Sequence, residues 1–449
     1  MIRNLLANLG FVFQFAGIFI VLNALFALYL GEEQESISFF LTSSIFLAIG
    51  FLLNTFSERK ELNLKSSFIL LFISFLGLSV VGSIPYLYLR LFGDIGLESF
   101  INSLFESTSG FTTTGFTLLK NVKNLPASLI FYRSLTQFIG GLGIVYILLT
   151  FLFPDNSLLI HRFSKIFGLK EKLSRIKSLF SEILIIYFVL TLISSLLLYF
   201  LVFRNIFDSV VFSMSAIATG GFSPFNSFAK FNTLSLLIMC IPMLLGAINF
   251  KVYIKPRNLE KDIKNEILGF IFLLVFLMLL LSRTHGNLRS SIFHAISTLT
   301  TSGYQTSEFY FTDFDMFVLS IFMFIGGMSL STSGGFKIYR VIYILKSIPT
   351  LIKNIFSEKK KPVEHYPFLL FTLYFLLVTI SSLILLTYGF SFADSIFETI
   401  SAISTTGLTK GLISGFSAEL KLLFIFLMIL GRIEIIPFFA IFLKSNKEI

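Results

Sequence analysis

Long apolar stretches recur along the chain, separated by short polar segments. Ten of them are long enough for a membrane-spanning helix, which needs roughly 20 mostly apolar residues. They begin near Leu5, Ile37, Phe68, Leu125, Ile183, Leu234, Ile267, Met316, Phe368 and Leu422. The first stretch ends in polar residues without a small-residue cleavage site, so we interpret it as a retained helix and not as a signal peptide. The pattern predicts an all-α polytopic membrane protein with ten spans.

The composition supports this interpretation. Of 449 residues, 55% are hydrophobic and 13% are charged, whereas soluble chains carry about 25% charged residues. Cys240 is the only cysteine, which excludes an intrachain disulfide, and the four histidines lack the close pairing of metal-binding helices. No carboxylate pair, histidine dyad or phosphate-binding loop recurs at a useful spacing. We therefore expect neither an enzyme, including one that acts on lipid, nor a cofactor in this chain.

The distribution of positive charge predicts the orientation. If the N-terminus lies inside, most lysines and arginines fall in connections on the same side, at 59–65, 162–177, 251–264 and 337–361. This is the positive-inside bias, and it places both termini in the cytoplasm and the chain in the cell membrane. The net charge of +10 then reflects topology and attraction to anionic lipid. We do not expect nucleic-acid binding.

Four semi-polar stretches, each too short to span the membrane, follow the spans that begin at Phe68, Ile183, Ile267 and Phe368. They cover residues 102–117, 208–223, 290–305 and 394–409. Each contains a serine, a threonine four residues later, and a glycine two residues after the threonine. These are Ser109, Thr113 and Gly115; Ser215, Thr219 and Gly221; Ser297, Thr301 and Gly303; and Ser401, Thr405 and Gly407. Their first residues predict capped short helices, with capping boxes from Ser103 to Glu106 and from Ser395 to Glu398.

Four copies in register predict a repeated unit of helix, short helix, Thr-x-Gly loop and helix. The alternative, small residues for close helix packing, suits a single copy better than four. The predicted division is a two-helix extension at 1–60, followed by repeats at 61–160, 161–258, 259–350 and 351–449.

Irregular backbone at membrane depth is tolerated where it lines a watery path, so the four loops predict one pore. Carbonyl oxygens of such loops can replace the water around a cation, and the short helices point their negative ends at the path. The predicted K⁺-binding filter consists of Thr113, Thr114, Gly115, Thr219, Gly220, Gly221, Thr301, Ser302, Gly303, Thr405, Thr406 and Gly407.

With these motifs, residues from about Phe68 to Leu443 resemble the Trk/Ktr/HKT superfamily of potassium-transporting membrane subunits. The extra helix pair before Phe68 is similar to the TrkH branch, since KtrB-type chains generally lack it. The resemblance implies four helix, pore-loop, helix repeats, a homodimer and one ion pathway per subunit. It also implies a cytoplasmic ring of nucleotide-binding TrkA- or KtrA-like subunits.

Two further stretches match landmarks of this superfamily. The segment 326–336 resembles an intramembrane gate loop, and its expected gate residues are Gly326, Gly327, Ser331, Thr332, Gly334 and Gly335. Arg432, in the last span, matches a pore-lining arginine near that loop. The alternatives are a glycine-rich packing face for the loop and snorkelling to the interface for Arg432, with Glu434 as a candidate partner. We expect a pore-facing Arg432.

Arg133 and Gln137 lie one turn apart, and we expect them to fasten the pore loop by hydrogen bonds. The basic runs 162–177 and 337–361 are candidate docking surface for the ring subunit. The primary interpretation is a K⁺ uptake subunit; a Na⁺-translocating or Na⁺-coupled transporter of the same architecture stays open. A carrier for an organic solute, or for sodium export, would instead show broken helices in two inverted halves.

Overall fold

The computed structural model describes residues 2–55, 64–151, 173–285, 287–306, 311–357 and 362–435. Regular structure in these ranges is helical, which confirms the predicted class. The longer helices are α1 (Ile2–Tyr29), α2 (Glu33–Thr55), α3 (Leu64–Gly82), α6 (Ala127–Phe151), α8 (Leu173–Leu198), α10 (Thr233–Ala247), α12 (Lys261–His285), α14 (Asp313–Ile325), α15 (Ile338–Phe356), α16 (Tyr366–Thr387) and α18 (Ala418–Arg432). The short ones are α4 (Ile84–Tyr88), α5 (Leu97–Phe111), α9 (Ile206–Ile217), α11 (Lys251–Ile254), α13 (Leu288–Leu299) and α17 (Phe392–Ile403).

The ten predicted spans each coincide with one of these helices, beginning within about ten residues of it. Among the described residues, six helical stretches are long and apolar enough to cross a membrane: Arg3–Tyr29, Glu33–Thr55, Ser66–Tyr88, Ser181–Phe203, Lys261–Thr284 and Tyr366–Thr387. Helices α10, α14 and α18 are shorter, at 15, 13 and 15 residues. The chain is therefore a multi-pass membrane protein, while the count of ten spans stays a prediction.

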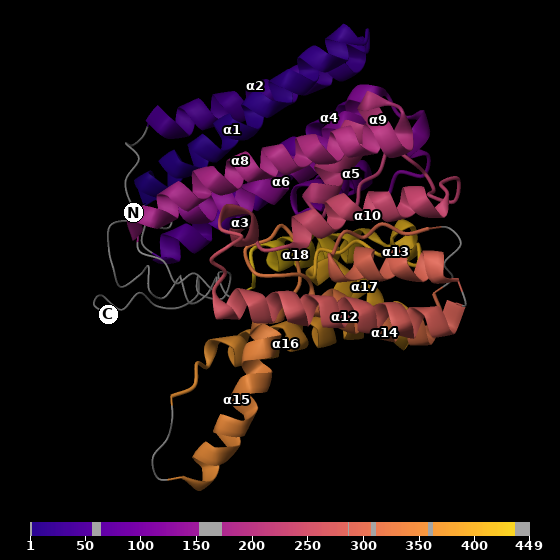
Figure 1. Ribbon diagram of the computed structural model, residues 1–449. Coiled ribbons are helices and arrows are strands. Elements are labelled where there is room, and N and C mark those ends of the chain that lie inside the picture. Colours follow the sequence, from indigo (N-terminus) through magenta and orange to yellow (C-terminus); the bar gives the residue numbers. More distant parts are fainter. Residues whose placement is uncertain are drawn as a thin grey trace.

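The first two helices lie at one edge of the molecule, where α1 and α2 form an antiparallel hairpin (Figure 1). Helix α1 packs on α3 and α6. At the opposite edge α15 projects away from the helical body (Figure 1). The short helices lie between the long ones: α5 packs against α3, α6 and α18, and α17 packs against α14, α16 and α18. This packing buries their C-terminal ends inside the body.

The short helices begin earlier than their sequence suggests. Side-chain oxygens that accept first-turn N–H groups belong to Asn205, Asn287 and Ser391. The predicted capping boxes are wrong, because Ser103 lies almost two turns inside α5 and Ser395 lies one turn inside α17. Their hydroxyls donate to the carbonyl oxygens of Ser99 at 2.7 Å and Ser391 at 2.8 Å. Glu106 and Glu398 are consequently available for contacts beyond the helix.

Candidate ion filter and intramembrane gate

The four short helices α5, α9, α13 and α17 end in the same backbone conformation. Each terminates at a threonine in the left-handed region: Thr113 (φ 55°), Thr219 (φ 52°), Thr301 (φ 55°) and Thr405 (φ 50°). A β-branched residue rarely adopts a positive φ. The N–H of the next residue donates to the carbonyl of the serine five positions earlier, at 2.8–2.9 Å in all four copies. This is a Schellman-type ending with threonine in the place of the usual glycine. Strain of this kind is concentrated at functional sites.

The filter glycines show that the four loops touch in a closed order. A Cβ atom added to each glycine would meet a carbonyl oxygen of the next loop. The pairs are Gly115 with Gly220 (2.2 Å), Gly221 with Ser302 (2.6 Å), Gly303 with Thr406 (1.9 Å) and Gly407 with Thr114 (1.9 Å). The fourth loop therefore returns to the first, and the loops form a ring. Real Cβ atoms do not approach other atoms so closely, so the ring requires glycine at these positions.

The ring presents oxygen atoms of the kind that suits a cation. The C-terminal ends of the four short helices lie next to it, and each carries partial negative charge. The buried hydroxyl oxygens of Thr113 and Thr405 have no hydrogen-bond partner. The structure therefore brings together, in one ring, the four loops that contain the twelve predicted filter residues.

The predicted gate segment lies directly against this ring. Helix α14 ends at Ile325, and the next helix, α15, begins at Ile338. Between them, the N–H of Gly334 donates to the Thr301 hydroxyl at 2.7 Å. A Cβ atom on Gly334 would lie 2.0 Å from the carbonyl oxygen of Ser404, at the end of α17. The segment is therefore an irregular loop packed under the third and fourth filter loops.

Hydrogen bonds attach the loop to the predicted second repeat. Thr332 donates from its N–H to the carbonyl oxygen of Gly246 at 3.1 Å, and from its hydroxyl to that of Ile217 at 2.8 Å. Ser331 instead binds within the loop, donating to Met328 at 2.6 Å. The base of the loop is closed by its glycines. Gly326 and Gly335 both have a positive φ and touch each other, and Gly327 packs on Ser333.

Arg432 holds the loop from the last helix. Its side chain is buried, with Nη1 donating to the carbonyl oxygen of Thr332 at 3.0 Å and Nη2 to that of Gly140 at 2.9 Å. The guanidinium thus joins α18, the gate loop and α6. This contradicts the snorkelling alternative. Glu434 pairs with the fully buried Arg340 of α15 and not with Arg432.

Sequence reasoning missed a second anchor of the gate loop. Glu266 lies in the apolar helix α12 and is 2% exposed. One carboxylate oxygen accepts the N–H of Ser329, and the other accepts the Ser329 hydroxyl at 2.8 Å. Asn249 also donates to that hydroxyl, at 2.9 Å. The available signal was weak, because Glu266 belongs to the polar stretch that directly precedes the predicted span at Ile267.

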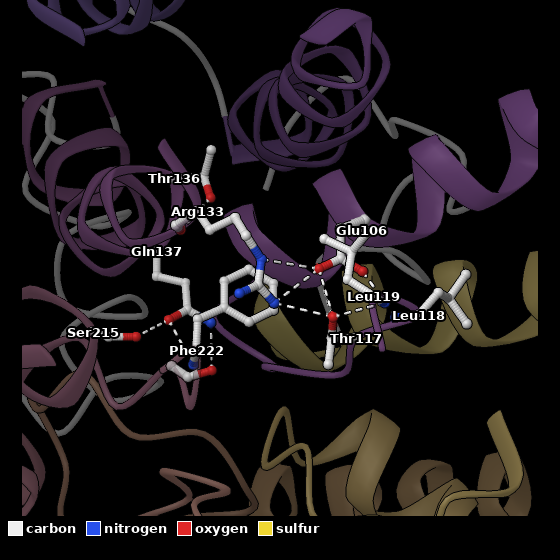
Figure 2. Close-up of polar contacts among 10 residues, drawn as sticks. Glu106, Thr117, Leu118, Leu119, Arg133, Thr136, Gln137, Ser215 and Phe222 are labelled. Carbon is white, nitrogen blue, oxygen red and sulfur yellow. Dashed lines mark hydrogen bonds and ion pairs between the residues drawn. The ribbon is translucent and has the colours of Figure 1, made fainter. Parts of the chain in front are cut away.

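Figure 2 shows how Arg133 fastens the first loop. Its Nη2 lies 3.0 Å from both Glu106 Oε1 and the Thr117 hydroxyl, and its guanidinium covers the Phe222 ring at 4.0 Å. Glu106 Oε2 accepts the N–H of Leu118 at 2.9 Å. Because Arg133 and Glu106 are both almost completely buried, this is an interior ion pair behind the filter.

Gln137, one turn along α6, fastens the second loop (Figure 2). Its amide nitrogen donates to the carbonyl oxygen of Gly220. Its amide oxygen accepts the Ser215 hydroxyl and the N–H of Phe222, the latter at 3.1 Å. The expected fastening role of Arg133 and Gln137 is confirmed, and it extends across the first two Thr-x-Gly loops.

Known proteins resemble this chain in sequence and in overall fold. The profile of the TrkH family, described as cation transport protein, matches residues 35–284 and 278–448. An uncharacterized cation transporter of Methanocaldococcus jannaschii is 29% identical, covering 98% of this chain and 95% of its own length. The Trk system potassium uptake protein TrkG of Escherichia coli is 29% identical over 92% of both chains. TrkH of Halomonas elongata is 32% identical over 64% of this chain and 63% of its own length. The crystal structure of the potassium transporter TrkH from Vibrio parahaemolyticus has the same fold, with a TM-score of 0.84 at 22% identity, covering 99% of both chains.

Proposed function

We propose that this chain, which belongs to the TrkH family of cation transport proteins, is the ion-translocating membrane subunit of a K⁺ uptake system. Relatives in this family are named potassium uptake proteins, which supports K⁺ as the transported ion. The single observation that carries the proposal is the closed ring of four Thr-x-Gly loops. The residues of the ring were singled out for this role by sequence alone.

In this proposal the ion sheds its water at the ring and is held by stacked carbonyl and threonine oxygens. The four helix ends favour cations over anions because they carry partial negative charge. The membrane potential contributes about 2.3 kcal/mol per unit charge per 100 mV, which drives uptake without ATP consumption by this chain.

The loop 326–336 serves as the gate below the filter. Support comes from its contact with the Thr301 hydroxyl and from its position across the ends of two filter helices. Arg432 stabilises the closed position through Thr332 and adds a positive charge beside the path.

We propose a homodimer with one pathway per subunit, both termini in the cytoplasm and the repeat boundaries given above. The regulatory nucleotide would bind a cytoplasmic TrkA- or KtrA-like ring. Of the two candidate docking runs, 337–361 includes α15, which projects from the body (Figure 1). Residues 162–172 of the other run, and 358–361 of this one, lie outside the described residues.

Uptake of radioactive rubidium and sodium by purified protein in liposomes tests the proposal. Preferential uptake of rubidium, competed by K⁺, is the expected result. Preferential sodium uptake would favour the Na⁺-translocating alternative, and the absence of uptake of either ion, also with the ring subunit added, would contradict the proposed function.

A further inference from the structure

Comparison of the four repeats identifies a position whose side chain holds the backbone after the filter glycine in three of the four loops. It lies nine residues before the filter glycine and is occupied by Glu106, Phe212, His294 and Glu398. In three repeats its side chain accepts the N–H of the residue three positions after the glycine. The bonds join Leu118 to Glu106 Oε2 at 2.9 Å, Thr306 to His294 Nε2 at 3.2 Å, and Lys410 to Glu398 Oε1 at 2.9 Å.

The second repeat is the informative exception. Its side chain at this position is Phe212, which cannot accept a hydrogen bond, and the residue three positions after Gly221 is Pro224, which has no N–H. The repeat that lacks the backbone N–H donor thus also lacks the side-chain acceptor. This pairing indicates that the acceptor is retained to hold the backbone after the glycine.

The two glutamates differ in how their charge is compensated. Glu106 is paired with Arg133. Glu398 is fully buried, and its Oε1 accepts the Thr409 hydroxyl at 2.8 Å in addition to the Lys410 N–H. Its Oε2 has no hydrogen-bond partner. The Lys410 ammonium binds Asp394 at 2.9 Å instead. Burying an ionised carboxylate without a cation is costly, so the geometry favours a hydrogen-bonding role for Glu398 over a charge-pairing one.

We propose that Glu398 is a positioning residue that determines specificity in the fourth filter loop. Its carboxyl group fixes the backbone after Gly407 and thereby the carbonyl oxygen of Thr406, which Gly303 of the neighbouring loop contacts. The inference rests on the proposed function of the ring as a K⁺ filter. Glu398 acts through the two hydrogen bonds that it accepts and not through its charge.

The test compares rubidium and sodium uptake into liposomes for matched variants. Glu398→Gln keeps an acceptor oxygen and should keep the wild-type uptake ratio. Glu398→Met has a similar size without an acceptor and should lower the rubidium-to-sodium ratio by about tenfold, as expected for the loss of two hydrogen bonds. Asp394→Asn removes a charge from the same helix without changing the Glu398 bonds, and the ratio should stay the same.

Three results would overturn the inference: a wild-type ratio in a normally inserted Glu398→Met protein, an equal loss in the Gln and Met variants, or a loss in Asp394→Asn as large as in the Met variant. Should Glu398→Met fail to insert, Thr409→Val removes one of the two bonds from the donor side, and an unchanged ratio there overturns it too. A wild-type protein that transports no rubidium contradicts the proposed function itself. A selective wild type with an equally selective Met variant contradicts only the role of Glu398.

Discussion

The guanidinium of Arg432 and the carbonyl oxygen of Thr332, 100 residues apart in the chain, are joined by a 3.0 Å hydrogen bond. The other terminal nitrogen of Arg432 binds Gly140 at 2.9 Å. Under the proposed function, Arg432 acts on conduction in two ways. It holds the gate loop in place, and it puts a fixed positive charge beside the path. At about 6 Å and an effective dielectric constant near 20, two unit charges repel by about 3 kcal/mol.

Replacement of Arg432 should separate these two effects. Arg432→Gln removes the charge and the paired donors, so cation flux in liposomes should rise on the order of tenfold or more. Arg432→Lys keeps the charge but cannot reach both carbonyl groups in the same planar geometry, so its flux should rise less. Unchanged flux in a Gln variant that inserts normally would show that Arg432 is only a structural anchor.

The sequence allowed the four Thr-x-Gly loops to be predicted because their signal is local and repeated. Thr113 and Gly115 recur with the same spacing in four copies, and Arg432 is conspicuous as a charge within an apolar span. The gate loop was recognisable for a similar reason, since glycine pairs such as Gly334 and Gly335 disfavour a continuous helix.

Contacts between distant residues could not be predicted in this way. Glu266 and Ser329 are 63 residues apart, and Arg340 and Glu434 are 94 apart, so no spacing rule joins them. The helix starts were missed because several serines could serve as caps. Ser103 and its counterparts satisfy carbonyl groups inside the first turn instead, where a serine hydroxyl can donate to a residue four positions earlier.

The ring geometry makes a sharp prediction for Gly407. Its φ of 83° and the 1.9 Å approach of a Cβ atom to Thr114 leave no room for a side chain. Gly407→Ala should therefore displace the first loop and lower the rubidium-to-sodium uptake ratio by about tenfold or more. Gly415→Ala, in the same repeat, is the matched control because no atom lies near its added Cβ. Equal ratios in the two variants would contradict a filter at this ring.

A second prediction about the ring concerns Gly303, whose added Cβ would meet Thr406 at 1.9 Å. Gly303→Ser should impair K⁺ over Na⁺ discrimination at normal expression, because the side chain forces the third and fourth loops apart. The measurement is the ratio of rubidium to sodium uptake. A variant that expresses well and discriminates between K⁺ and Na⁺ as before would show that the third loop is not part of the filter.

Glu266 provides a test of the gate that does not touch the filter. Glu266→Ala leaves the Ser329 N–H and hydroxyl without their acceptors, and the loss of about 1–3 kcal/mol per bond weakens the closed loop. Flux in liposomes without the ring subunit should rise severalfold, with the uptake ratio unchanged. Glu260→Gln is a suitable control, because Glu260 pairs with Lys251 and not with the loop. A change in selectivity without a change in flux would show that Glu266 supports the filter and not the gate.

The buried pair of Arg133 and Glu106 predicts a strongly non-additive effect on stability. Arg133→Met leaves the Glu106 carboxylate buried without a cation, which should cost about 3–5 kcal/mol of unfolding free energy. Glu106→Gln alone leaves the guanidinium unpaired and should also destabilise. The double variant removes both charges and should recover most of the loss, because the amide carbonyl of the substituted side chain can still accept the Leu118 N–H. The measurement is thermal unfolding, in detergent, of four purified proteins: the wild type, the two single variants and the double variant. Additive losses in the double variant would mean that the two side chains stabilise the first loop independently and that the ion pair itself contributes little.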